Sequence, residues 1–116
     1  MSYNSAVYDG GGIYNVGTLA VDGSGRHMTV SDCAITGNSA AYGGGIYNDT
    51  GSTATVSNCQ LSSNNCYSEG GGIYNAGAAF ALTVSNSTFS GNTDGPSGSP
   101  DNIFGPYTDG GGNIFN

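Results

Sequence analysis

The sequence predicts an all-β fold, a parallel β-helix (a solenoid of stacked coils) of about three and a half coils without terminal caps. Two observations carry this prediction. A glycine-rich hexapeptide recurs along the chain, and a second motif with alternating apolar residues recurs between its copies. Self-similarity at a period of roughly 20–50 residues indicates a stacked repeat architecture, in which each repeat packs on its neighbours.

The first motif, Gly-Gly-Gly-Ile-Tyr-Asn, occupies residues 10–15, 43–48 and 70–75, and an altered copy occupies residues 110–116. We expect its glycines to form a close turn and the next residues a short strand. Side chains alternate along a strand, so the isoleucines point inward and the following aromatic residues point outward. The predicted inward column is Ile13, Ile46, Ile73 and Ile114. The predicted outward aromatic stripe is Tyr14, Tyr47, Tyr74 and Phe115.

The second motif begins Thr-Val-Ser and occupies residues 29–38, 55–64 and 83–92. Its apolar positions predict further inward columns: Val30, Val56 and Val84; Ile35, Leu61 and Phe89; and Cys33, Cys59 and Ser87. Asparagines recur at two corners, at Asn38, Asn64 and Asn92 and at Asn15, Asn48, Asn75 and Asn116. Asparagine suits turns, and stacked asparagine amides bond to one another, so we expect these columns to join neighbouring coils.

These repeats predict one β-helix domain over residues 1–116. Coil 1 covers about 4–38 with an insertion at 16–28, coil 2 about 39–64, and coil 3 about 65–92. A loop insertion at 94–109 and a terminal strand at 110–116 complete the chain. No helical pattern is available at either end to serve as a cap. Uncapped coils expose unpaired strand edges, to which another chain can pair.

The composition excludes several classes of function. The net charge is −7, and the chain has a single basic Lys or Arg residue, so a phosphate-binding surface for nucleic acid or anionic lipid is not expected. No stretch reaches the roughly 18 apolar residues of a spanning helix, and the first residues do not resemble a signal peptide. Recurrent Tyr, Phe, Val and Ile residues predict an ordered chain despite 22 glycines.

The alternation of Gly-Gly-Ile strands with Ile/Leu/Phe-x-x-Asn elements resembles the repeats of polymorphic outer-membrane proteins and related bacterial surface β-helix proteins. The elements that carry this resemblance are 44–46 and its copies, together with 35–38, 61–64 and 89–92. The resemblance covers nearly the whole chain apart from the two insertions. It implies a right-handed β-helix, and a surface-exposed passenger with an adhesive or structural role.

Cofactor and metal chemistry are not expected. Cys33 and Cys59 fall in one column on adjacent coils, where a disulfide is possible, although free core thiols are favoured; Cys66 is expected to be a lone thiol. With one His and no Cys-x-x-Cys pair, no zinc site is predicted. Acids before the glycine strands or in the last loop are candidate calcium ligands, although solvated surface charge is favoured. They are Asp9, Glu69, Asp109, Asp94 and Asp101.

β-Helices also include polysaccharide lyases and hydrolases, so a catalytic site is an alternative. The candidate cluster is Asp22, Arg26 and His27, all in the first insertion. We favour a polar loop without catalytic residues, and therefore a protein that is not an enzyme.

The preferred prediction is a structural protein that stacks end to end into an extracellular or cell-surface fibre, with itself as partner. Its assembly interface comprises Asn4, Tyr8, Ile13, Tyr14, Asn15, Ile114, Phe115 and Asn116. The alternative is a surface adhesin that binds glycans through the aromatic stripe, and a weaker one is a small carbohydrate-active enzyme.

Overall fold

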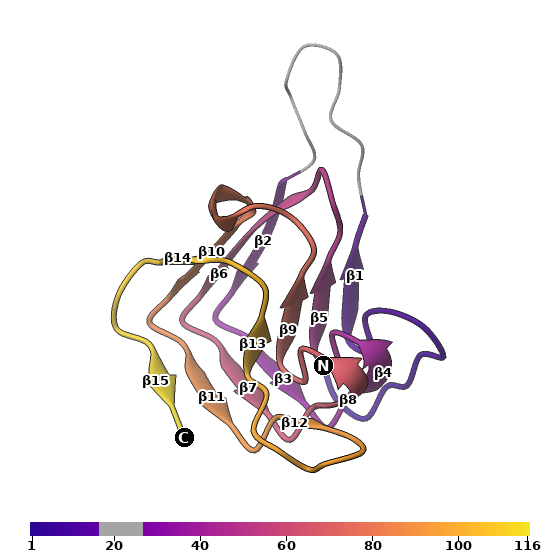
Figure 1. The fold of residues 1–116 in the computed structure, drawn as a ribbon. Coiled ribbons are helices and arrows are strands. Elements are labelled where there is room, and N and C mark those ends of the chain that lie inside the picture. The colour runs from indigo at the N-terminus through magenta and orange to yellow at the C-terminus, as the bar shows by residue number, and fades with distance from the viewer. Residues whose placement is uncertain (17–26) are drawn as a thin grey trace.

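The computed structural model describes residues 1–16 and 27–116, and it is an all-β parallel solenoid (Figure 1). The predicted fold class is confirmed. Every pair of named strands is parallel, and each strand pairs with its counterpart in the next coil. The strands of each sheet therefore lie side by side along the stack, as Figure 1 shows.

Four sheets wrap around the solenoid axis. The first contains β1 (Ile13–Asn15), β5 (Ile46–Asn48), β9 (Ile73–Asn75) and β13 (Ile103–Phe104). The second contains β2 (His27–Ser31), β6 (Thr53–Ser57), β10 (Leu82–Ser85) and β14 (Thr108–Asp109). The third contains β3 (Ala34–Thr36), β7 (Gln60–Ser62), β11 (Thr88–Ser90) and β15 (Ile114–Phe115). The fourth contains β4 (Ser39–Tyr42), β8 (Asn65–Glu69) and β12 (Thr93–Asp94).

One 3₁₀ turn, η1 (Ala79–Ala81), precedes β10. Among the helices of the described residues, none is long and apolar enough to cross a membrane.

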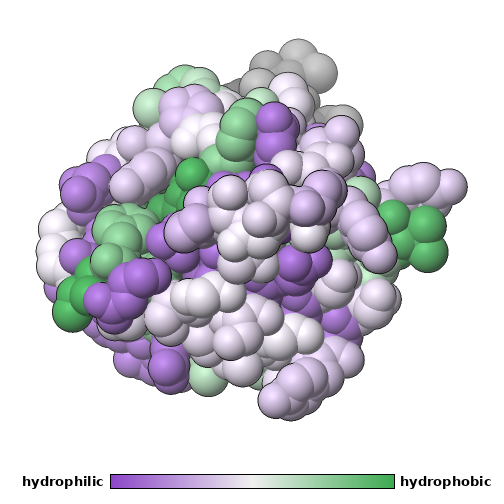
Figure 2. Space-filling view, turned by 60° about the horizontal axis from the view of Figure 1, so that its bottom comes forward, coloured by the Kyte–Doolittle hydropathy of each residue, from purple (hydrophilic) through white to green (hydrophobic). Residues whose placement is uncertain are grey.

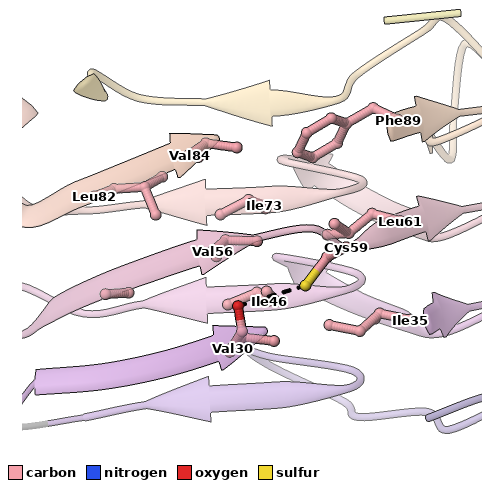
Figure 3. Packing of buried hydrophobic residues seen from close by; sticks show 11 residues of the cluster. Val30, Ile35, Ile46, Val56, Cys59, Leu61, Ile73, Leu82, Val84 and Phe89 are labelled. Atoms are coloured by element: carbon pink, nitrogen blue, oxygen red, sulfur yellow. Dashed lines mark hydrogen bonds between the residues drawn. The ribbon is translucent and has the colours of Figure 1, made fainter. Parts of the chain in front are cut away.

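The core contains most members of the predicted columns, together with Ala54 and Leu82, which the columns did not include. Val56 lies between Val30 and Val84 in strand register, and Leu61 lies between Ile35 and Phe89 (Figure 3). These side chains share one buried cluster with Ile46, Ile73, Leu82, Ala54 and Cys59. Alternation along each short strand sends one set of side chains inward and the other outward, as sequence alternation predicts.

The first residues of the chain belong to the stack as well. Ser2, Ser5 and Asp9 form parallel bridges to Thr36, Ser39 and Tyr42. Asn4 consequently lies at the same corner as Asn38.

The fourth coil differs from the prediction. Ile103, and not Ile114, pairs with Ile73, so Ile103 completes the isoleucine column. Ile114 pairs instead with Thr88, and Phe115 pairs with Phe89. The segment 94–109 is therefore not a loop insertion, since it contains β13, β14 and the end of β12. The sequence at 110–116 copies the glycine motif, but the hydrogen-bond register places it in the third sheet.

The first insertion also ends earlier than expected. His27 and Met28 belong to β2 and pair with Thr53 and Ala54. Of the predicted insertion 16–28, residues 17–26 lie outside the described part of the chain.

Candidate functional site

The most prominent outward feature is the aromatic stripe, a row of four neighbouring rings on the first sheet, of which the last three are stacked. Tyr14 and Tyr47 have ring centroids 5.2 Å apart, and Tyr47 and Tyr74 lie 5.1 Å apart at an interplanar angle of 8°. Phe104 continues the row, 5.3 Å from Tyr74 at 9°. The prediction that Phe115 is the fourth ring is wrong, because Phe115 stacks on Phe89 of the third sheet at 5.1 Å.

The stacking decides which part of each ring is accessible. The inner rings, Tyr47 and Tyr74, have a neighbouring ring on both faces, so they present edges and hydroxyl groups to solvent. Burial, together with the nearby carboxylates of Asp9 and Asp49, raises the pKa of Tyr47 to about 12. The Tyr47 hydroxyl therefore stays protonated at neutral pH. In the described chain, only the end rings, Tyr14 and Phe104, have one face without a ring partner.

A buried ladder of asparagine amides runs along the corner before the fourth sheet. Asn38 Nδ2 donates to Asn64 Oδ1 at 3.0 Å, and Asn64 Nδ2 donates to Asn92 Oδ1 at 3.0 Å. The backbone N–H groups of Asn38 and Asn64 donate to the same oxygens, which fixes the orientation of each amide. Asn4 adds a rung below, donating to Asn38 Oδ1 at 3.0 Å. The amide-to-amide bonds of the ladder therefore have a direction, with each donor on the coil nearer the N-terminus.

A second ladder follows the first sheet. Asn15 Nδ2 donates to Asn48 Oδ1 at 2.7 Å, and Asn48 Nδ2 donates to Asn75 Oδ1 at 2.8 Å. The column ends with Gly105, and Asn75 Nδ2 donates to the Pro106 carbonyl instead. Both ladders confirm that the corner asparagines join neighbouring coils. Asn116, predicted as a further member of this column, lies beside β11, where its N–H donates to the Phe89 carbonyl.

The residues predicted for assembly lie at the two ends of the stack. Tyr8, Tyr14, Ile114 and Phe115 are exposed hydrophobic side chains, and Ile13 packs partly against the core. Asn4 and Asn116 are exposed, and Asn15 is half-buried. The structure thus places one group on the first coil and the other on the last, while contact between copies stays a prediction.

The three cysteines are free thiols. Cys59 is buried, and its Sγ contacts the Val30 carbonyl at 3.4 Å (Figure 3). Cys33 is exposed, with its Sγ 2.9 Å from the Ser31 carbonyl. The prediction that Cys33 lies in the core is wrong, because its side chain is exposed. Cys66 is buried opposite Ala40, and burial raises its pKa to about 12.

The acidic residues do not converge on a metal site. The described residues contain no group of three or more Asp, Glu, His or Cys side chains suited to a metal ion. Asp94 accepts hydrogen bonds from Ser97 and Ser99, and Asp109 accepts from the Gly111 N–H and Asn113. Asp101 accepts from the Gly70 N–H. Asp94 and Asp109 therefore close local turns, whereas Asp101 joins neighbouring coils. Desolvation and the nearby Asp49 raise the pKa of Asp9.

The candidate catalytic cluster is only partly visible. Asp22 and Arg26 lie outside the described residues. Both ring nitrogens of His27 lie within hydrogen-bond distance of threonine hydroxyls, 2.7 Å from Thr53 Oγ1 and 3.1 Å from Thr55 Oγ1. This arrangement suits a strand-pairing role for His27.

A cavity of about 250 Å³ lies between the turn at 50–53 and the segment 76–81. Its wall includes exposed Phe80 and buried Ser52, whose Oγ has no hydrogen-bond partner in the described chain. No titratable side chain is among the described residues that line it, so this cavity offers no acid–base chemistry. The sequence did not predict this cavity. It also did not predict that Phe104 joins the aromatic stripe, or that the Tyr42 ring packs edge-on against Tyr74.

Comparison with known proteins supports the architecture. A family model described as a right handed beta helix region matches residues 1–114. No curated protein and no solved structure matches the chain.

Proposed function

The chain belongs to the right-handed β-helix family, and we propose that it is a non-enzymatic structural protein that assembles end to end into an extracellular or cell-surface fibre. The observation that carries this proposal is the open edge at both ends of its sheets. Among the described strands, the first two sheets begin on β1 and β2 and end on β13 and β14, and the third sheet ends on β15. Such edges present unpaired N–H and C=O groups that another strand can satisfy.

Side chains at these edges support pairing between copies. The aromatic stripe ends with Tyr14, 48% exposed, at the first coil and with Phe104, 39% exposed, at the last. Each has one ring face without a ring partner in the described chain, so a second copy stacked head to tail would continue the row. Repetition of this heterologous contact generates a filament.

Hydrogen bonds rather than an apolar patch are expected to provide most of the affinity. Figure 2 shows hydrophobic groups scattered among polar ones on one face of the molecule, without a single large apolar area there. Copies with a net charge of −7 also repel one another, and salt screens that repulsion. Assembly should therefore strengthen as salt concentration rises.

The ring geometry favours self-assembly over glycan binding through the stripe. A sugar stacks on the face of an aromatic ring, and the faces of Tyr47 and Tyr74 are occupied by neighbouring rings. The open faces of Tyr14 and Phe104 lie at the ends, where a second copy would contact them.

Electron microscopy and sedimentation velocity of the purified chain test the proposal. We expect rods longer than one protomer, increasing with protein and salt concentration. Phe104→Asp should weaken assembly by adding a charge at the junction, whereas Tyr67→Asp on β8, at a side chain 69% exposed, should not. A chain that stays monomeric at high protein and salt concentration contradicts the fibre. Equal assembly of the two variants excludes Phe104 from the junction.

A further inference from the structure

The fourth coil replaces the glycine triad of the other coils with Pro100, Asp101 and Asn102. Strand register puts Asn102 opposite Gly72, since the next residues, Ile103 and Ile73, are paired. The hydrogen bonds agree: Gly72 N–H donates to the Asp101 carbonyl, as Gly45 N–H donates to the Gly71 carbonyl in the coil before. These three residues therefore occupy the triad position on the C-terminal coil.

The glycines are required where another coil follows. A Cβ at Gly12 would lie 2.7 Å from the Gly45 carbonyl oxygen, and one at Gly45 would lie 2.5 Å from the Gly72 carbonyl oxygen. Both distances are well inside van der Waals contact, because a C–H group approaches a carbonyl oxygen to only about 3.3 Å. A residue with a Cβ at this position thus conflicts with a coil stacked in the same register.

Asn102 has such a Cβ, and its amide fills a position in the first ladder. Asn92 Nδ2 donates to Asn102 Oδ1 at 3.1 Å and to the Leu61 carbonyl at 2.9 Å. The other rungs join residues of successive coils, 26 to 34 positions apart, but Asn102 follows Asn92 by only 10 positions. Its side chain therefore takes the role that an asparagine of a following coil would have.

Asp101 makes an equivalent replacement. The N–H groups of Gly10 and Gly43 donate to the backbone carbonyls of Tyr42 and Glu69 in the following coil. The Gly70 N–H donates instead to the Asp101 carboxylate at 2.6 Å. A side chain satisfies a donor that elsewhere needs the backbone of a further coil.

Pro100 changes the turn itself. Gly70 has a φ of 75°, in the left-handed region, whereas proline is fixed near −65° and does not repeat that turn.

We infer that Pro100–Asp101–Asn102 forms a stop on the C-terminal coil that limits stacking of a second copy. The inference rests on the proposed end-to-end assembly and identifies the residues that limit this assembly. For the junction to form, the Asn102 amide must leave Asn92, and its Cβ must clear the Gly12 carbonyl of the incoming copy. Wild-type fibres are consequently short, because the C-terminal coil of each copy resists addition of the next copy.

The test compares Asn102→Gly with Asn102→Ala, two variants that both lose the amide but differ in the Cβ. Critical concentrations are measured by sedimentation velocity. The Gly variant should assemble at a concentration about tenfold below that of the Ala variant, since relief of a steric overlap is worth roughly one such factor.

A triple variant, Pro100→Gly/Asp101→Gly/Asn102→Gly, restores the whole triad and should form the longest fibres. Its matched control, Pro96→Gly/Ser97→Gly/Ser99→Gly, adds as many glycines and removes one proline in the adjoining exposed loop, and should behave as wild type. Circular dichroism confirms folding of each variant.

The outcomes separate the two proposals. If the Gly variant, the Ala variant and wild type all assemble at the same critical concentration, the stop is overturned and the proposed fibre stands. If neither wild type nor any glycine variant assembles, the fibre itself is overturned. Fibres from the triad variant, with wild type remaining monomeric, support the stop and contradict the wild-type fibre.

Discussion

The inner and end coils carry related residues in the same columns, yet they differ in burial. Cys59 is buried and Cys33, one coil away, is exposed. Phe89 is fully buried, whereas Phe115, paired with it in register, is 45% exposed. A residue in this solenoid is therefore buried by the coils on either side of it, and position within the coil alone is not sufficient. Stability in such a stack is approximately a sum over neighbouring coils.

The asparagine ladder shows the same difference for polar groups. Asn64 is fully buried, and its amide bonds to Asn38, Asn92 and the Ile35 carbonyl. Asn4 is exposed, and among the described residues its side chain bonds only to Asn38. The inner rungs hold the fold, and the end rung is available to a partner.

Truncation of a buried phenylalanine should have the largest effect on stability, and the same truncation on an end coil should have a much smaller one. Phe89→Ala should lower the free energy of unfolding by about 3–5 kcal/mol, the range for truncating a buried aromatic residue. Phe115→Ala should cost less than about 1.5 kcal/mol, because half of its ring is already solvated. Urea denaturation followed by circular dichroism measures both. Equal losses would show that end and inner coils are buried alike in solution.

Substitutions in the first asparagine ladder should lower the free energy of unfolding by a smaller amount. Asn64→Ala leaves buried donors of Asn38 and the Ile35 carbonyl without partners, which should cost about 2–3 kcal/mol. Asn4→Ala removes an exposed rung and should cost about 0.5–1 kcal/mol. The same denaturation series measures this pair. A larger loss for Asn4→Ala would contradict the assignment of structural weight to the inner rungs.

The reactivity of the three thiols also distinguishes exposed from buried positions, and it can be measured on the wild-type protein. The thiolate is the reactive form, so exposed Cys33 should label at pH 8 in the native protein. Burial raises the pKa values of Cys59 and Cys66, the latter to about 12 from an ordinary 9.0, so both should stay unlabelled until the chain unfolds. Mass spectrometry after alkylation counts the modified cysteines. Rapid native labelling of Cys66 would contradict its burial.

The raised pKa of Cys66 also has a consequence for stability. The unfolded thiol loses its proton near pH 9 while the folded one retains it, so the unfolded state binds fewer protons between about pH 9 and 12. The free energy of unfolding should therefore fall as the pH rises through that range. The Cys66→Ala variant is the control, in which this part of the pH dependence is absent.

Sequence reasoning identified the first three coils because their motifs repeat with nearly constant spacing. Within these three coils it assigned the isoleucine, valine and asparagine columns correctly, and strand alternation is sufficient for that. It failed at the fourth coil, where Asn102–Gly105 takes the position of the glycine strand without the glycine triad. The later Gly-Gly-Gly resembled the motif more closely, but backbone pairing with β11 fixed its place.

The candidate site was predictable only in part. The stripe through Tyr74 follows from the repeated motif, but its fourth ring depends on the register of β13. The exposure of Cys33 depends on whether a coil covers it, which column assignment does not address. The stop at 100–102 becomes visible only when the space around each glycine is known.

The central claim is that the edge strands of one copy pair with those of another. Amide hydrogen exchange across a concentration series tests it most directly, because exchange reports the protection of each backbone N–H. We predict that protection in β1, β13 and β15 rises with protein concentration, while protection in β6 and β10 stays constant. Edge strands that exchange at the same rate at every concentration would contradict it.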